Sequence, residues 1–279
     1  MTYNNSTSVI LYRNIFLLVD RYDMSETSPS FRMKLPSADY FASLVKAISS
    51  VVDEGSFTAD SDSIKLTGMD PAHVSMVNFV MSKEAAEEYV CQNPVEIKVN
   101  VSELLKFLKR AGNESLSIEY DDEKKKLKLV FTNTAARKER TFVLSTLETG
   151  TGPTPVPKLS FEAKCRVDTG AFAEAVDDAS LVSDYARITI SPTELIVSSK
   201  SDVQTHHSRF EKDGTIIHEI KADKEVSASF SLTYLEKIVS SSKSLSDETE
   251  IELSNNKPIK LSFPITGGKI EFLIAPRLE

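Results

Sequence analysis

The stretches NVSELLKFLKRAG (residues 100–112) and SLTYLEKIVSSSK (residues 231–243) resemble each other and decide the fold. In both, apolar residues recur every three or four positions, which is the period of one face of an α-helix. Asn100 with Glu103 forms a capping-box pattern and Gly112 is a stop signal, while Ser231 is a candidate N-cap. The same predicted helix therefore occurs twice, which indicates an internal repeat.

A second pair of similar stretches precedes these helices by roughly 60 residues in each half. FRMKLPSADYF (residues 31–41) and FEAKCRVDTGAF (residues 161–172) each predict a short strand that runs into an amphipathic helix. The expected apolar faces consist of Phe41, Leu44, Val45, Ile48 and Val52 in the first of these helices, and of Phe172, Val176, Ala179 and Val182 in the second, over residues 170–182.

Hairpin patterns follow the later helix in both halves. LSIEYDDEKKKLKLVF (residues 116–131) and TEIELSNNKPIKLSF (residues 249–263) alternate apolar and polar residues, as strands with one buried face do. Each half thus has two helices and many short strands. The sequence predicts an α+β fold of two similar sheet-plus-two-helix domains, which arose by tandem duplication.

The boundary between the halves is TLETGTGPTPVPKLS (residues 146–160), which is rich in glycine and proline and lacks periodicity. We expect it to be a connecting loop between a first domain at residues 31–145 and a second at residues 161–279. Residues 1–30 have an apolar patch but no leader pattern. We expect a disordered arm there, with a partner-binding arm as the alternative.

Composition narrows the function classes. The chain has 279 residues, of which 41% are hydrophobic and 27% charged, and it can form two globular cores. No apolar run approaches the roughly 18 residues of a membrane span, so we expect no membrane partner. The net charge of −8 argues against binding nucleic acid over the whole surface but is compatible with a local basic stripe. Cys91 and Cys165, in no ligand spacing, predict neither a disulfide framework nor a zinc site and favour a reducing intracellular compartment.

No convincing catalytic constellation occurs in the sequence, so we predict a protein that is not an enzyme and uses no cofactor or metal. Residues 266–269, Thr-Gly-Gly-Lys, lack the complete phosphate-loop pattern and fit a hairpin turn. His206 and His207 lie in an extended stretch, which would turn their rings to opposite faces and away from a shared metal ion. The acidic groups at residues 121–123 and 177–178 fit turns and solvated helix faces better than general acids.

Three segments in order resemble the proliferating cell nuclear antigen family of DNA sliding clamps, in its archaeal form. They are GMDPAHVSMVNF (residues 68–79), KVNVSELLKFLKRAGNES (residues 98–115) and FLIAPRLE (residues 272–279), and the resemblance covers residues 31–279. It implies a ring of three subunits with pseudo-sixfold symmetry, which encircles duplex DNA as a processivity factor. It also implies a clamp-loader ATPase as a partner, together with a DNA polymerase, a flap nuclease and a DNA ligase.

Helices line the hole of such a ring and contact phosphates without reading the sequence. The resemblance assigns this role to six cations, for which solvation of an exposed helix face is the alternative explanation: Lys46, Lys106, Lys109, Arg110, Lys237 and Lys243. The helix at residues 170–182 departs from the family, because it carries Glu174, Asp177 and Asp178 and no basic residue. We therefore expect an uneven lining of the hole.

The family docks short partner peptides in a pocket on the other side of each subunit. The resemblance assigns that pocket to Met69, His73, Val74, Met76, Val156, Leu159, Pro258, Leu273, Ala275 and Pro276. A methionine suits such a surface because its unbranched side chain repacks easily against several partners. Core packing is the alternative for Met76.

Subunits of the family pair through edge strands, which the resemblance assigns to residues 140–146 and 203–210. The expected interface residues are Arg140, Phe142, Leu144, Val203, Thr205 and His207. The ring is either a homotrimer or a heterotrimer of related chains, and we expect it in the cytoplasm on the chromosome, or in the nucleus of a eukaryote. The alternatives are a checkpoint-type clamp subunit and an unrelated duplicated α+β ligand-binding protein.

Overall fold

The computed structural model describes residues 29–112, 114–148 and 154–277. The first half contains helices α1 (Ala38–Ile48) and α2 (Val101–Leu108) and the short 3-10 helix η1 (Lys83–Ala85). Its strands are β1 (Phe31–Leu35), β2 (Glu54–Ala59), β3 (Ser63–Met69), β4 (Ser75–Ser82), β5 (Glu88–Cys91), β6 (Val95–Asn100), β7 (Ser115–Asp121), β8 (Lys126–Asn133) and β9 (Lys138–Ser145).

The second half repeats this layout with helices α3 (Thr169–Ser180) and α4 (Leu232–Ser242). Its strands are β10 (Ala163–Asp168), β11 (Tyr185–Ile190), β12 (Glu194–Lys200), β13 (Thr205–Glu211), β14 (Ile217–Ala222), β15 (Val226–Ser231), β16 (Glu248–Leu253), β17 (Ile259–Ile265) and β18 (Gly268–Ile274). The expected α+β fold of two sheet-plus-two-helix units is confirmed.

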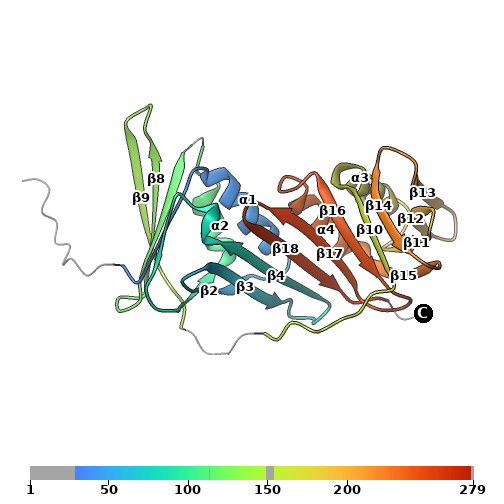
Figure 1. Cartoon of the computed structure of the whole chain (residues 1–279), viewed down its shortest axis with the longest axis horizontal. Helices are drawn as coiled ribbons and strands as arrows, with labels where there is room; N and C mark the ends of the chain where they lie inside the picture. The colour runs from blue at the N-terminus through green and yellow to red at the C-terminus, as the bar shows by residue number, and fades with distance from the viewer. Residues whose placement is uncertain (1–28, 113, 149–153, 278–279) are drawn as a thin grey trace, which may run out of the picture.

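Three antiparallel sheets organise the described residues. A nine-stranded sheet, in the order β14-β10-β16-β17-β18-β4-β3-β2-β6, crosses both halves of the chain. A five-stranded sheet, β5-β1-β7-β8-β9, stands at one end of the molecule, and a four-stranded sheet, β13-β12-β11-β15, stands at the other (Figure 1). The free edges β9 and β13 therefore lie at opposite ends of the molecule.

The two halves join through β4 and β18, which pair from Met81 opposite Gly268 to Ser75 opposite Ile274. The alternating residues on one side of this pair are fully buried, among them Phe79, Phe272 and Ile274. One hydrophobic core consequently runs through both halves, so the domains are fixed together by a shared sheet as well as by the connecting loop.

The four described α-helices form a continuous layer, because α2 packs on α1, α1 on α4, and α4 on α3. The predicted caps are present at Asn100, whose side chain accepts from the Glu103 amide, and at Ser231, which makes no side-chain cap bond. Gly112 is not the stop of α2: the helix ends at Leu108, and the chain leaves it in a tighter turn in which the Arg110 amide donates to the Phe107 carbonyl, three residues back. Both α1 and α3 also end before Val52 and Val182, the last predicted apolar positions.

Candidate functional site

The exposed side of the helix layer carries three of the six predicted cations along its helices and the other three at helix ends. Lys46 on α1, Lys106 on α2 and Lys237 on α4 are all exposed, and an adjacent apolar side chain on each helix is buried: Val45, Leu105 and Ile238. Lys109 and Arg110 are exposed but lie at and beyond the end of α2, and Lys243 caps α4, so the prediction that these three stand on helix faces is wrong. They extend the cationic surface to the helix ends, where a cation also interacts favourably with the helix dipole.

Carboxylates interrupt this cationic surface. Lys106 is ion-paired with Glu103 one turn earlier on α2. Helix α3 exposes Glu174, Asp177 and Asp178 and contributes no cation. The exposed charges of α3 are thus all acidic, whereas α1, α2 and α4 each expose one acid, Asp39, Glu103 and Glu236, as well as a lysine.

The opposite side of the nine-stranded sheet contains a row of apolar side chains that crosses the joint between the halves. Met69 on β3 pairs with Met76 on β4, and Met76 pairs with Leu273 on β18. Directly opposed residues in antiparallel strands place their side chains on the same face. These three side chains, which we call the docking row, therefore form one strip, and Lys260 on β17 continues it.

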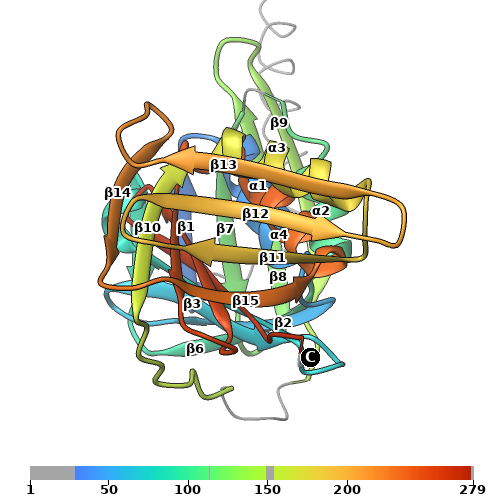
Figure 2. The same cartoon turned by 90° about the vertical axis from the view of Figure 1, so that its right-hand side faces the viewer.

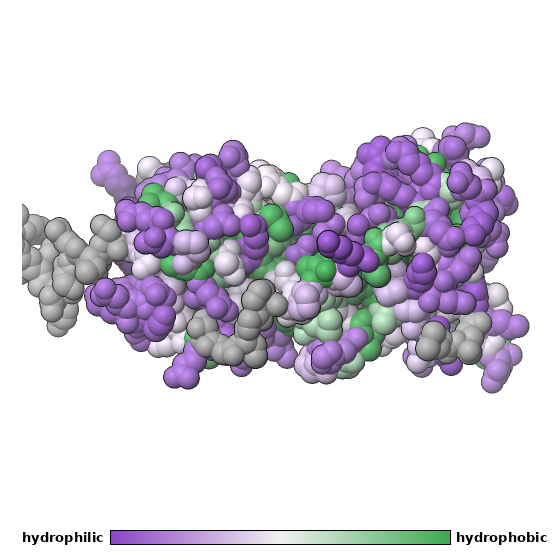
Figure 3. Space-filling view, turned by 60° about the horizontal axis from the view of Figure 1, so that its bottom comes forward, coloured by the Kyte–Doolittle hydropathy of each residue, from purple (hydrophilic) through white to green (hydrophobic). Residues whose placement is uncertain are grey.

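A small hollow of about 50 Å³ lies between the docking row and the end of the connecting loop. It is lined by Met76, Val156, Leu159 and Leu273 of the predicted pocket, together with Asn78, Pro157, Phe161, Lys260 and Glu271. A larger hollow of about 590 Å³ lies next to it along β2 and β3 and includes Met69 and Thr154. Figure 3 shows apolar side chains grouped in the middle of this face, between hydrophilic ends. Met76 is only 3% exposed, but it lines the hollow outside the main core.

The other predicted pocket residues lie around this centre. Val74 and Ala275 are held together, because the Ala275 amide donates to the Val74 carbonyl at 2.8 Å. His73 is exposed in the turn before β4 and has a positive φ of 58°. Pro258 and Pro276 are half-buried at the ends of β17 and β18. None of these five residues lines either hollow.

A row of polar residues beside the docking row was missed by the sequence reasoning. Asn78 accepts from Thr67 and donates to Glu271 at 3.0 Å, so β3, β4 and β18 are linked by side chains on this face. Burial raises the pKa of Glu271, but hydrogen bonds from Lys269 and Asn78 more than offset it and hold the pKa below its usual range. The alternation of β4 and β18 indicates which residues face outward, but their juxtaposition depends on a pairing between strands almost 200 residues apart. Nothing in the sequence marks that pairing.

The predicted interface residues lie on the two free edges. On β9, Arg140 is ion-paired with Glu114, and Phe142 packs on Phe107 and Phe131. Both side chains therefore make contacts within their own subunit. Leu144 is half-buried in the same way, whereas Val143 between them is 60% exposed. At the other end, Thr205 and His207 are exposed on β13, and Val203 just before it is 88% exposed. Figure 2 shows β13 at the free edge of its sheet.

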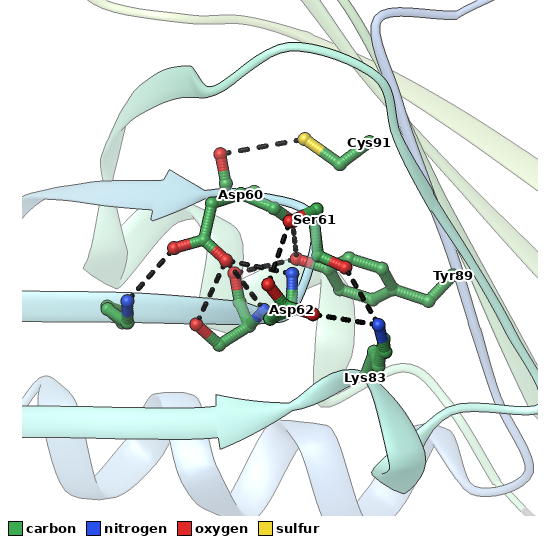
Figure 4. A network of polar contacts seen from close by, with 9 residues as sticks. Asp60, Ser61, Asp62, Lys83, Tyr89 and Cys91 are labelled. Atoms are coloured by element: carbon green, nitrogen blue, oxygen red, sulfur yellow. Dashed lines mark hydrogen bonds and ion pairs between the residues drawn. The ribbon is translucent and has the colours of Figure 1, made fainter.

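A compact polar cluster at the turn between β2 and β3 serves to hold that turn (Figure 4). The Asp60 carboxylate accepts from Lys65 at 2.9 Å and from the amides of Asp62 and Ser63, which lowers its pKa to about 2. Tyr89 donates to the carbonyls of both Asp60 and Ser63. Burial raises the pKa of the Cys91 thiol, which disfavours the thiolate that a nucleophile needs.

No group of three or more His, Cys, Asp or Glu side chains within residues 29–112, 114–148 and 154–277 is arranged to hold a metal ion. In the same ranges, no helix combines the length and the apolar character that a membrane crossing requires. The Thr266–Lys269 stretch is the β17–β18 hairpin turn, with Gly267 at φ 70°.

The sequence matches two family descriptions across almost all of these residues. Residues 30–150 match "Proliferating cell nuclear antigen, N-terminal domain" and residues 155–277 match "Proliferating cell nuclear antigen, C-terminal domain". The chain is 32% identical over 244 residues to a protein of Methanococcus vannielii named "DNA polymerase sliding clamp", covering 86% of this chain and 96% of the relative. It is also 32% identical to "DNA polymerase sliding clamp 1" of Pyrobaculum aerophilum, with 87% and 96% covered.

Solved structures agree on the fold. The crystal structure of PCNA from Thermococcus kodakaraensis superimposes with a TM-score of 0.83 at 24% identity, over 88% of this chain and all of that one. The two family matches together span both halves of the chain, and they meet at the connecting loop. The chain belongs to the proliferating cell nuclear antigen family, whose members are non-enzymatic sliding clamps.

Proposed function

We propose that this chain is a DNA polymerase sliding clamp that closes into a ring of three subunits around duplex DNA. The observation that carries the proposal is the position of the free edges β9 and β13 at opposite ends of a molecule whose helix layer exposes cations on one side. Head-to-tail pairing of β9 with β13 of the next subunit would bring the helix layers to the inside. Membership of the family supports DNA binding and ring formation in general terms.

The cations support sliding rather than tight binding. Contacts between lysine or arginine and phosphate are sequence-independent and individually weak, so the ring moves along the duplex without a preferred register. The acidic surface of α3 weakens the attraction further. Retention on DNA would then come from closure of the ring, and the clamp would remain on the chromosome as long as it is closed.

The docking row and its hollow support a role as a tether for other proteins. In this proposal, the hollow binds an aliphatic side chain of a short peptide. The exposed connecting-loop residues Val156 and Leu159 form the wall of the hollow on the loop side. An extended part of the peptide would pair with the loop by strand addition. The partners that suit this arrangement are a replicative polymerase, a flap nuclease and a DNA ligase, with a clamp-loader ATPase to open the ring.

The decisive experiment measures the mass of the protein in solution and its effect on the processivity of a DNA polymerase. The full chain should form a species of three times 30.9 kDa in solution, and it should lengthen the products of a polymerase on primed circular DNA in the presence of a clamp loader. A chain that stays monomeric alone but forms rings with related clamp chains would indicate a heterotrimer. A monomer without any effect on processivity, alone or with such chains, would refute the proposal.

A further inference from the structure

Asp70 holds the turn that leads from β3 into β4, and this turn carries His73 and Val74 of the proposed peptide pocket. The Asp70 carboxylate accepts from the amide of Ala72 at 3.0 Å and from that of Val74 at 2.8 Å, and it also accepts from the Ser75 amide. Asp70 is only 7% exposed. Burial raises its pKa, but the amide donors more than offset this and keep the pKa below its usual range. The carboxylate is therefore the charged centre on which the turn is organised.

A residue of the other domain reaches this carboxylate. Tyr234, on α4 of the second half, donates its hydroxyl to Asp70 Oδ2 at 3.3 Å. The same oxygen accepts from the Ala72 amide, so Tyr234 contacts the atom that fixes the outer part of the turn. The second contact from that half is the Ala275 amide, which holds the far end of the turn at Val74.

Tyr234 also belongs to the helix layer. It lies one turn before Lys237, which is exposed on the side proposed to face DNA. The Tyr234 side chain thus connects the helix layer directly with the turn between β3 and β4.

We infer that Tyr234 is a positioning residue for peptide docking: its hydroxyl, through Asp70, sets the turn that joins Met69 and Met76 of the docking row. The inference rests on the proposed peptide pocket. It makes the pocket a property of both domains, because a turn of the first is fixed by a helix of the second. A change in the angle between the domains would then alter the affinity for partner peptides.

The chain supplies a matched control in Tyr40. Tyr40 is the third residue of α1, as Tyr234 is the third residue of α4, and each makes a hydrogen bond to the other domain. The Tyr40 hydroxyl accepts from the Thr266 amide at 2.8 Å, in the β17–β18 hairpin and away from the pocket turn. Tyr40→Phe and Tyr234→Phe therefore each remove one cross-domain hydroxyl, and only the second one holds the pocket turn.

The test measures binding of a labelled synthetic peptide with one aliphatic and two aromatic anchors to the full-length ring. Tyr234→Phe should weaken binding by about threefold to tenfold, mainly through faster dissociation, whereas Tyr40→Phe should leave it unchanged. Hydrogen exchange at the amides of Val74 and Ser75 should accelerate in Tyr234→Phe alone. In an Asp70→Asn background, Tyr234→Phe should have little further effect, because the two residues act as one unit.

The outcomes separate the inference from the function on which it rests. Unchanged peptide affinity in Tyr234→Phe, with tight binding by the wild-type ring, would overturn the inference and leave the pocket in place. Equal weakening by both tyrosine variants would overturn it as well, because the effect would then come from domain packing in general. A wild-type ring that does not bind the peptide at all would overturn the pocket assignment together with the inference.

Discussion

Met76 on β4 and Leu273 on β18 stand directly opposite each other, although they come from different halves of the chain. Their side chains meet in the middle of the nine-stranded sheet and line the same small hollow. A peptide that occupies this hollow would contact both domains at once. The joint between the domains and the proposed docking site are therefore the same part of the molecule.

Met69→Ala should weaken docking of a peptide with aliphatic and aromatic anchors by about tenfold, roughly the 1–2 kcal/mol expected for a central apolar contact. Met69 is half-buried at the end of the docking row, so its removal should hardly change the free energy of unfolding. Fluorescence anisotropy with the labelled peptide measures the effect. Leu181→Ala is the control, because Leu181 is 79% exposed at the end of α3, away from the row. Equal affinities for wild type and Met69→Ala would refute the assignment of Met69.

Reversal of charge on α3 should strengthen DNA binding. Asp177→Lys replaces an exposed carboxylate by a cation on the helix that lacks one. We expect tighter binding to short linear duplexes and a steeper dependence on salt, by about one unit in the slope for each new phosphate contact. Lys237→Ala should have the opposite effect. Titrations at several salt concentrations test both changes, and identical slopes would show that these helices do not face the DNA.

Val143→Lys should shift the ring toward smaller species. Val143 is 60% exposed on the edge strand β9, and a lysine at a strand edge opposes pairing with another strand. Mass photometry or light scattering at several concentrations measures the change. Val90→Lys is the matched control, since Val90 is 42% exposed on β5, the other edge of the same sheet. If Val90→Lys alone shifted the protein toward smaller species, the subunit contact would lie at β5, and the assignment to β9 would be refuted.

Gly268→Ala should destabilise the joint between the domains. A Cβ atom at Gly268 would stand 2.0 Å from the Val80 carbonyl oxygen, which is backbone of the paired strand β4, so the strands would have to move apart. We expect a loss of at least 1–3 kcal/mol in the free energy of unfolding, measured by urea denaturation. Gly112→Ala should be nearly neutral, because nothing lies within 4 Å of its Cβ position.

Asp60→Asn should lower stability at neutral pH and lose its effect in acid. The pKa of Asp60 is lowered to about 2 in the folded protein, so its carboxylate stabilises the fold above the pKa of the unfolded chain. This stabilisation is lost as the pH falls through about 4 toward 2. Since the side chain is 31% exposed, we expect a modest difference of about 1 kcal/mol at pH 7. Thermal unfolding of both proteins from pH 7 to pH 2.5 tests it, and a constant difference would contradict the assignment.

The helices and hairpins could be predicted from the sequence because their signals are local. The capping pattern at Asn100 and the alternation of residues 116–131 depend only on neighbouring residues, and both are confirmed. The end of α2 was predicted wrongly at Gly112, since a tighter turn, with the Arg110 amide on the Phe107 carbonyl, closes the helix without a glycine. The resemblance to the family assigned Met69, Met76 and Leu273 to the pocket, but it did not predict that they stand in one row or that Tyr234 contacts Asp70. Those contacts depend on how the two halves meet through β4 and β18.

The shared sheet also decides where a ring of such subunits can open. Within a subunit, separation of the halves would break the β4–β18 ladder and expose a core that includes Phe79 and Phe272. Between subunits of the proposed ring, only the pairing of β9 with β13 would have to be undone. We therefore expect a loading enzyme to open the ring at an interface between two subunits. Each subunit should remain a rigid body while the ring is loaded and unloaded.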